Sequence, residues 1–236
     1  MAFPKAEVQG SFGDQFKEDS VQEHRLGMRM EHPDGRAYRY CQNVATAVAG
    51  RLYQSPVRVT NHTNENPFAA AAKGATSVTV DVAAAPALNI FRDGFLVDET
   101  NGKTYSIAGN TAADPTVLTL NEALDTDLAT GDVVSMFKSP YRDVIIKTAA
   151  VQDAPSIGVA CAAYVATRFC WFQSYGICAV LAEDSLALGE SAVASPVNDA
   201  GAVAAKTTTS GEDQTVGSVY EIGSDGTIAT IFLLLG

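Results

Sequence analysis

The chain has little positive charge, little charge of either sign and no long apolar run. Of its 236 residues, 18% are charged, and 16 Lys and Arg stand against 27 Asp and Glu, a formal net charge of −11. Because phosphate backbones are bound by basic surfaces, this composition predicts no nucleic-acid partner. No apolar run approaches the roughly 20 residues of a membrane helix, so we expect no membrane partner either. The first ten residues lack the apolar core of a signal peptide, which favours assembly in a cytoplasm.

Sequence motifs that carry chemistry are also missing. The chain has no glycine-rich phosphate loop, no HExxH and no GxSxG, and its three histidines are scattered. We therefore expect no catalytic residue, no cofactor and no metal site, and we interpret the protein as a non-enzyme. The four cysteines, Cys41, Cys161, Cys170 and Cys178, form no CxxC pair. Buried free thiols are expected, with a cross-strand pairing of Cys170 with Cys178 as the alternative.

Positive charge is concentrated near the N-terminus. Residues 1–60 carry 8 basic and 7 acidic side chains, whereas residues 148–236 carry 2 and 9. Most of the basic side chains in the first part are arginines, which pair bidentately and stack on aromatic rings at protein interfaces. The candidate interface residues toward a partner protein or an adjacent subunit are Arg25, Arg29, Arg36 and Arg39.

What the sequence does contain is a succession of short strand patterns. The clearest is residues 77–82, where three valines alternate with Ser, Thr and Asp. Turn signals separate such patterns at Asp34-Gly35, Asn101-Gly102 and Asp225-Gly226. Helix-like stretches are limited to residues 43–49 and 121–128. We predict an all-β fold, with an extended N-terminal arm and hairpin followed by two β-rich units of barrel or sandwich type.

The patterns divide the chain into three consecutive parts. Residues 1–60 are expected to form the N-terminal arm and β-hairpin, 61–147 a central β domain and 148–236 a C-terminal β domain. Residues 1–24 lack periodicity, so we expect an extended arm that a neighbouring molecule orders. The arm and the four arginines are expected to face that neighbour, while the acidic segment from Thr148 onward faces solvent.

Three groups of loose strand and turn patterns cover most of the chain after residue 25. They are residues 34–40 with 49–54, residues 94–97 with 102–107, 117–120 and 139–145, and residues 158–160 with 169–176 and 216–217. Together they resemble the head decoration, or cement, proteins of tailed bacteriophages. The resemblance implies a structural protein of the virion that binds the outside of the capsid. Its partner would be the major capsid protein.

We expect such a protein to stabilise the capsid by bridging coat subunits. An acidic outer surface fits this role, because net charge keeps particles from associating. Open strand edges are covered in a ring of identical subunits, so we expect a homo-oligomer, and the resemblance implies a trimer. The alternative is an adhesion module of the virion surface that binds host glycans on Trp171 and Tyr175. The other interpretation of the Trp171 cluster is core packing.

Overall fold

The computed structural model describes residues 7–149, 153–195, 199–206 and 214–235, and the chain forms two compact units. Unit 1 is made of residues 1–57 and 140–236, and unit 2 of residues 58–139. The expected N-terminal part and the expected C-terminal part therefore belong to one unit, although the central part separates them in the chain. The expected boundaries at 60 and 147 move to 57 and 139. Long-range strand pairing causes this difference, because β4 (Ala37–Gln42) pairs with β13 (Phe169–Leu181).

The fold is all-β, as predicted. The helical segments of the described residues are two single turns of 3₁₀ helix, η1 (Asp14–Phe16) in unit 1 and η2 (Thr60–His62) in unit 2. The two helix-like stretches of the sequence, residues 43–49 and 121–128, form bends and turns instead. Within the described part of the chain, no helical segment has the length and hydropathy that a membrane crossing needs.

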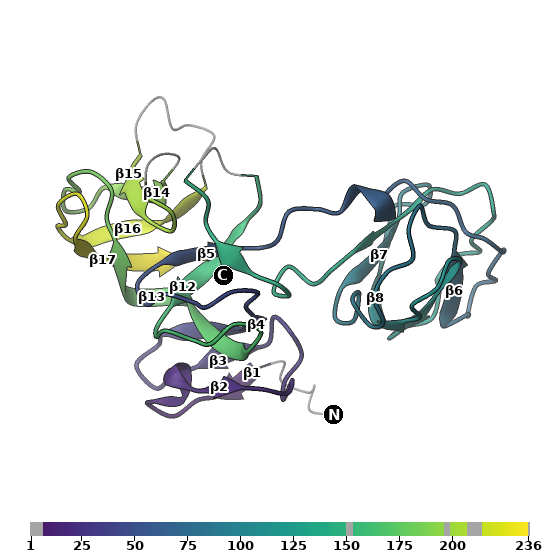
Figure 1. Ribbon diagram of the computed structural model, residues 1–236, viewed down its shortest axis with the longest axis horizontal. Coiled ribbons are helices and arrows are strands. Elements are labelled where there is room, and N and C mark those ends of the chain that lie inside the picture. The colour runs from purple at the N-terminus through teal and green to yellow at the C-terminus, as the bar shows by residue number, and fades with distance from the viewer. Residues whose placement is uncertain (1–6, 150–152, 196–198, 207–213, 236) are drawn as a thin grey trace. The chain divides into compact units, whose positions relative to one another are not determined.

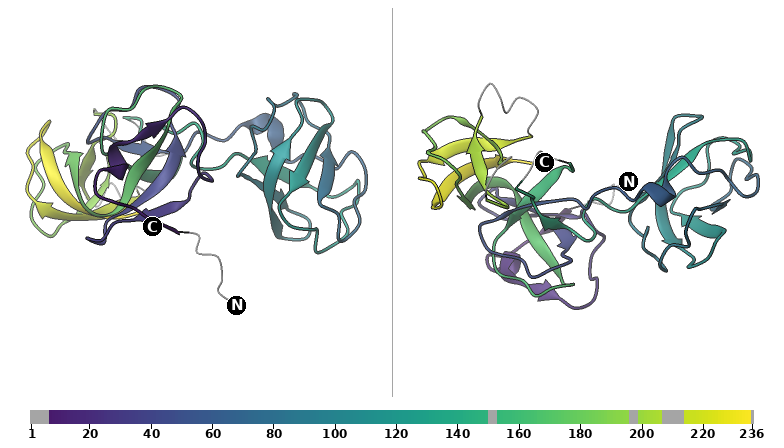
Figure 2. Two further views of the ribbon diagram at one scale, coloured as in Figure 1. Left: turned by 90° about the horizontal axis from the view of Figure 1, so that it is seen from below. Right: turned by 45° about the horizontal axis from the view of Figure 1, so that its top comes forward.

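Unit 1 contains a 12-stranded sheet with the main order β1-β3-β4-β13-β17-β16-β14-β15. Its other strands, β2, β5, β11 and β12, attach beside this path. Besides β4 and β13, its strands are β1 (Glu7–Gln9), β2 (Glu18–Asp19), β3 (Arg29–Glu31), β5 (Leu52–Gln54), β11 (Ile145–Ile146), β12 (Ser156–Ala160), β14 (Ser191–Ala194), β15 (Val203–Ala205), β16 (Thr215–Glu221) and β17 (Ile228–Leu234). Figure 1 shows β1 to β4 at one end of unit 1 and β14 to β17 at the other, joined by β13. The first and last parts of the chain thus lie on a common sheet (Figure 2).

Strand β13 connects the two ends of unit 1. Its first half pairs with β4 and its second half with β17. Gly176 has a φ of 88°, a value that glycine adopts without strain, and the register to β4 shifts just before it. The bulge lets one strand continue across the whole unit.

Residues 7–24 also belong to the fold of unit 1. Strand β1 pairs in parallel with β3, and β2 pairs antiparallel with β13. Gln15 of η1 is buried, and its carbonyl oxygen accepts a hydrogen bond from the Tyr164 hydroxyl. The carboxylate of Glu18 accepts a hydrogen bond from the Val165 amide at 2.7 Å. The expectation that only a neighbour orders this segment is thereby corrected, while residues 1–6 lie outside the described residues.

Three clusters of buried side chains hold unit 1 together. The first consists mainly of small and branched side chains from β13, β14, β16 and β17. The second centres on Phe172, whose ring lies 4.9 Å from that of Tyr53. The third cluster contains Leu26, Met30, Tyr38, Tyr40, Phe169 and Trp171. The aromatic-rich sequence of β4 and β13 therefore serves core packing at this end of the unit.

Unit 2 is a five-stranded antiparallel sheet with its own core. Its strand order is β10-β7-β8-β9-β6. The strands are β6 (Ser77–Val80), β7 (Phe95–Asp98), β8 (Lys103–Asn110), β9 (Thr116–Leu120) and β10 (Val134–Phe137). As the alternation predicted, Val78 and Val80 are buried while Ser77 is exposed. Each strand thus contributes one face to a core that also holds Phe91.

Candidate interaction surface

Two of the four candidate arginines are neighbours on the β3–β4 hairpin. Arg29 and Arg39 lie directly opposite each other in the pairing register. Arg29 donates from Nη1 to the carboxylates of Glu7 at 2.6 Å and Glu31 at 3.2 Å. Arg39 donates from Nη1 to the Gly27 carbonyl oxygen at 3.0 Å. Both guanidinium groups are therefore held by unit 1 itself, although neither is fully buried.

The other two candidate arginines, Arg25 and Arg36, differ in their surroundings. Arg25 is exposed and precedes the hairpin in the chain. Arg36 lies in the hairpin turn, where its Nε donates to the Asp34 carboxylate at 2.8 Å. Its guanidinium lines a groove whose lining includes neither Arg29 nor Arg39. Arg36 therefore borders a surface feature that Arg29 and Arg39 do not line.

The aromatic platform expected for the adhesion alternative is not formed. Trp171 is 5% exposed, and its ring lies 4.8 Å from that of Tyr40 and 5.4 Å from that of His24. Tyr175 is exposed, but it contacts Phe232 edge-on at 5.3 Å. Trp171 is thus a core residue, which was the other interpretation of this cluster, and Tyr175 alone reaches the surface.

The cysteines are free thiols. Cys170 and Cys178 lie on the same strand, so the cross-strand pairing considered for them does not form; the residue opposite Cys170 is Cys41. Burial raises the pKa of Cys161 to about 12, and it raises the pKa of the other three thiols as well. All four are therefore protonated at neutral pH, a state in which thiols are poor nucleophiles and poor metal ligands.

One face of β13 and β17 is apolar and exposed. Residues directly opposite in an antiparallel pair share a face, and Tyr175 pairs with Leu234 and Ile177 with Phe232. The alternate residues of both strands point into the first core cluster. We call the outer surface the β13–β17 face; its side chains are Tyr175, Ile177, Ala179, Ile228, Thr230, Phe232 and Leu234. The exposed fraction reaches 53% for Leu234 and 55% for Ile228.

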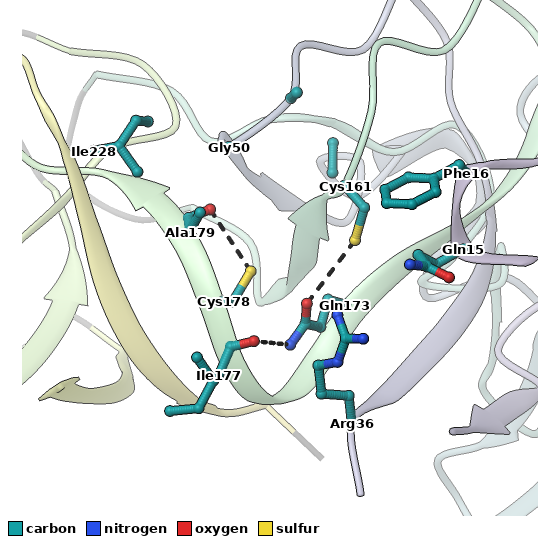
Figure 3. A pocket seen from close by; sticks show the side chains of 12 residues that line it. Gln15, Phe16, Arg36, Gly50, Cys161, Gln173, Ile177, Cys178, Ala179 and Ile228 are labelled. Carbon is teal, nitrogen blue, oxygen red and sulfur yellow. Dashed lines mark hydrogen bonds between the residues drawn. The ribbon is translucent and has the colours of Figure 1, made fainter. Parts of the chain in front are cut away.

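A groove of about 400 Å³ runs along part of this face. Its floor contains Gln173, Ile177 and Ala179 of β13. Figure 3 shows Phe16 and Ile228 on opposite sides of it. Arg36 lies at one end, and we call the whole depression the Arg36 groove. A second hollow, of about 520 Å³, shares Arg36 and Ile177 and extends over Tyr175 and Phe232.

The Arg36 groove offers apolar surface and one guanidinium. The side-chain amide of Gln173 is fixed, because it donates to the carbonyl oxygens of Tyr175 at 3.1 Å and Ile177 at 2.8 Å. Asp34 accepts from the backbone amide of Arg36 and, among its guanidinium nitrogens, from Nε alone, so both Nη atoms lack a hydrogen-bond partner among the described residues. In the same residues, no group of three or more His, Cys, Asp or Glu is placed to hold a metal ion. Such a lining suits an apolar side chain with a carboxylate beside it.

Sequence reasoning named Arg36 and Tyr175 but missed the other side chains of this surface. The signal was present in β17, whose run from Ile228 to Leu234 is apolar on both faces except at Thr230. A strand that is apolar on both faces needs cover on both. Unit 1 covers one face of β17 and leaves the other exposed. No family model matches the chain, and neither the curated proteins nor the solved structures that were compared with it include a match.

Proposed function

We propose that the protein is a structural component of a bacteriophage virion. It binds the outside of the capsid and stabilises the shell by bridging coat subunits. Its partners are the major capsid protein and further copies of itself, as a homotrimer. It is assembled in the host cytoplasm and works without enzymatic activity, on the capsid exterior.

The exposed β13–β17 face is the observation that carries this proposal. Large apolar patches on otherwise charged proteins are typical of surfaces that bind other proteins. Here the aliphatic and aromatic side chains lie side by side on two paired central strands of a chain with a net charge of −11, which favours a protein partner for them. The protonated thiols and the fixed amide of Gln173 supply no reactive group in the Arg36 groove. Binding of a protein therefore fits this surface better than catalysis does.

The resemblance to decoration proteins supplies the identity of the partner. The adhesion alternative rested on a platform of Trp171 and Tyr175, and no observation favours it once Trp171 is in the core. We propose that the β3–β4 hairpin faces the coat. Arg25, which is exposed just before this hairpin, would bind an acidic coat surface, and such a contact weakens as salt rises. Arg29 and Arg39 would contribute less, because Glu7, Glu31 and the Gly27 carbonyl already hold their guanidinium groups.

Co-sedimentation of the purified chain with capsids that lack it tests the proposal. We expect saturable binding at hundreds of copies per particle. The variant Arg25→Gln should bind more weakly than the wild type, with a smaller dependence on salt, whereas Lys73→Gln in unit 2 should bind as the wild type does. Absence of binding by the wild-type chain would refute the proposed function. Equal binding by wild type and Arg25→Gln would refute the orientation alone.

A further inference from the structure

We propose that copies of this chain bind one another through the β13–β17 face, with Arg36 of one copy paired to Glu221 of the next. The inference deepens the proposed function, because it rests on the homo-oligomer and names its contact surface. It commits to a second copy as the occupant of the face. Arg36 and Glu221 carry opposite charges and lie at the border of the apolar surface, and their positions support this contact.

The centre of the β13–β17 face carries no charged side chain. Its residues on β13 and β17 are apolar or aromatic, apart from Thr230. Beyond β17 lies β16, where Tyr220, the neighbour of Glu221 at the bulge, is 65% exposed. An uncharged centre excludes an electrostatic attraction as the main source of affinity, so shape and apolar area must provide it.

The two charges lie at diagonally opposite corners of the face. Arg36 comes just before Ala37, which pairs with Tyr175 on the β4 side of β13. Gly176 lies directly against it, because a Cβ built on this glycine would be 3.1 Å from Cγ of Arg36. The guanidinium is therefore fixed beside the end of the face that holds Tyr175.

Glu221 occupies the other corner. It lies opposite Thr230 of β17, and Thr230 lies opposite Ala179 of β13. Glu221 is therefore on the β16 side of the face, and its row lies four positions along β13 from that of Tyr175. Its side chain is exposed and forms no ion pair within the described residues.

This arrangement is complementary to itself. A copy rotated about a symmetry axis beside the face brings its Glu221 corner toward the Arg36 corner of the first copy. The free Nη atoms of Arg36 can then donate to the incoming carboxylate while Asp34 keeps Nε. An apolar side chain next to Glu221 would enter the Arg36 groove. Closed symmetry repeats the same contact for every copy, so no apolar face is left exposed.

A charge-reversal series in the full chain tests the inference, with the mass in solution measured by sedimentation velocity. We expect the wild type to be oligomeric at micromolar concentration. Arg36→Glu and Glu221→Arg should each weaken association about tenfold or more, because each places like charges together. The double variant carrying both changes should recover association, since the swapped pair is again attractive.

Ile177→Asn supplies a second, uncharged test at the centre of the face, and it should also yield monomers. Its matched control is Leu88→Asn in unit 2, a residue that is 67% exposed, which should leave the oligomer intact. Circular dichroism confirms that each variant is folded. A wild-type monomer, or an oligomer that survives both Ile177→Asn and the single charge reversals, would overturn the inference. So would a double variant that fails to recover, since Arg36 and Glu221 would then not be paired.

Capsid binding by the wild type and the same variants distinguishes a failure of this inference from a failure of the proposed function. Binding to capsids that lack the chain is measured in parallel with the solution mass. A monomer that still binds capsids contradicts the self-contact and the homotrimer, leaves the proposed capsid binding standing, and indicates that the coat occupies the face. An oligomer that does not bind capsids contradicts the proposed function alone.

Discussion

A buried imidazole makes the stability of unit 1 sensitive to pH. His32 is 2% exposed, and neither ring nitrogen has a hydrogen-bond partner among the described residues. Its ring lies 4.6 Å from that of Tyr38 and 5.7 Å from that of Phe12. Burial lowers the pKa of His32 below its ordinary value, and nearby Arg36 lowers it further, against a smaller opposing effect of acidic neighbours.

The direction of the pH effect follows from this lowered pKa. In the folded protein His32 stays neutral at pH values where the unfolded chain already binds a proton, so acid favours unfolding. The free energy of unfolding should therefore fall as the pH drops through about 6.5, by at most about 1.4 kcal/mol per pH unit for one proton. His32→Phe should remove this part of the pH dependence. Urea unfolding of both proteins between pH 7.5 and 5 measures it, and parallel curves would contradict the assignment.

At the scale of the element, the bulge in β13 depends on a single glycine, Gly176. Gly176→Val places a branched side chain at a φ of 88° and against Arg36. We expect a loss of about 1–3 kcal/mol in the free energy of unfolding, because a branched residue is strained in this region. Gly131→Ala is the control, since its Cβ would meet nothing within 4 Å and its φ is ordinary. Equal urea midpoints for the two variants would show that the bulge tolerates a side chain.

The N-terminal strands offer a second test at this scale. Removing residues 1–24 takes away β1, η1 and β2, and with them contacts to the third core cluster, such as the His24 ring against Trp171 and the Asp19 carboxylate that accepts from the Tyr40 hydroxyl. Trp171 is the one tryptophan of the chain and is buried there, so its fluorescence reports the loss of these contacts directly. We expect the emission maximum of the shortened chain to shift to longer wavelength and its stability to fall. An unchanged emission maximum would mean that the segment is a passive tail after all.

The elements that the sequence predicted best are those with a clear alternation of polar and apolar residues. The predicted strand at residues 77–82 corresponds to β6, which begins at the same residue and ends two residues earlier, at Val80. Strands β1, β2 and β15 have two or three residues each, too few for a period to be recognised. The pairing of the strands could not be predicted from local patterns, because the neighbours β4 and β13 are more than a hundred residues apart in the chain. That distance is why one unit was predicted as two separate parts.

The interaction surface was predicted only in fragments for a related reason. Arg36 and Tyr175 are conspicuous in the sequence, because arginine and tyrosine are enriched at interfaces. Ile177, Phe232 and Gln173 resemble ordinary strand residues, and their shared face exists only after β13 and β17 pair. Trp171 was an equally conspicuous residue, but its strand register places it in the core.

At the scale of the whole molecule, the chain contains one unit inserted into another. All strands of unit 2 pair with each other, and its core is composed of its own side chains. We therefore expect residues 58–139, expressed alone, to fold into a β structure with cooperative urea unfolding. Circular dichroism measures both features. A fragment without cooperative unfolding would mean that unit 2 depends on unit 1 for its stability.

Stabilisation of the capsid is the central claim, and thermal disruption of the particle tests it most directly. Purified chain is added to capsids that lack it until binding is saturated. Light scattering then measures the temperature at which these capsids and untreated capsids are disrupted. We predict a higher disruption temperature for the saturated capsids, because each bound oligomer links neighbouring coat subunits and binding to the intact state stabilises it. The same disruption temperature at demonstrated saturation would contradict the account.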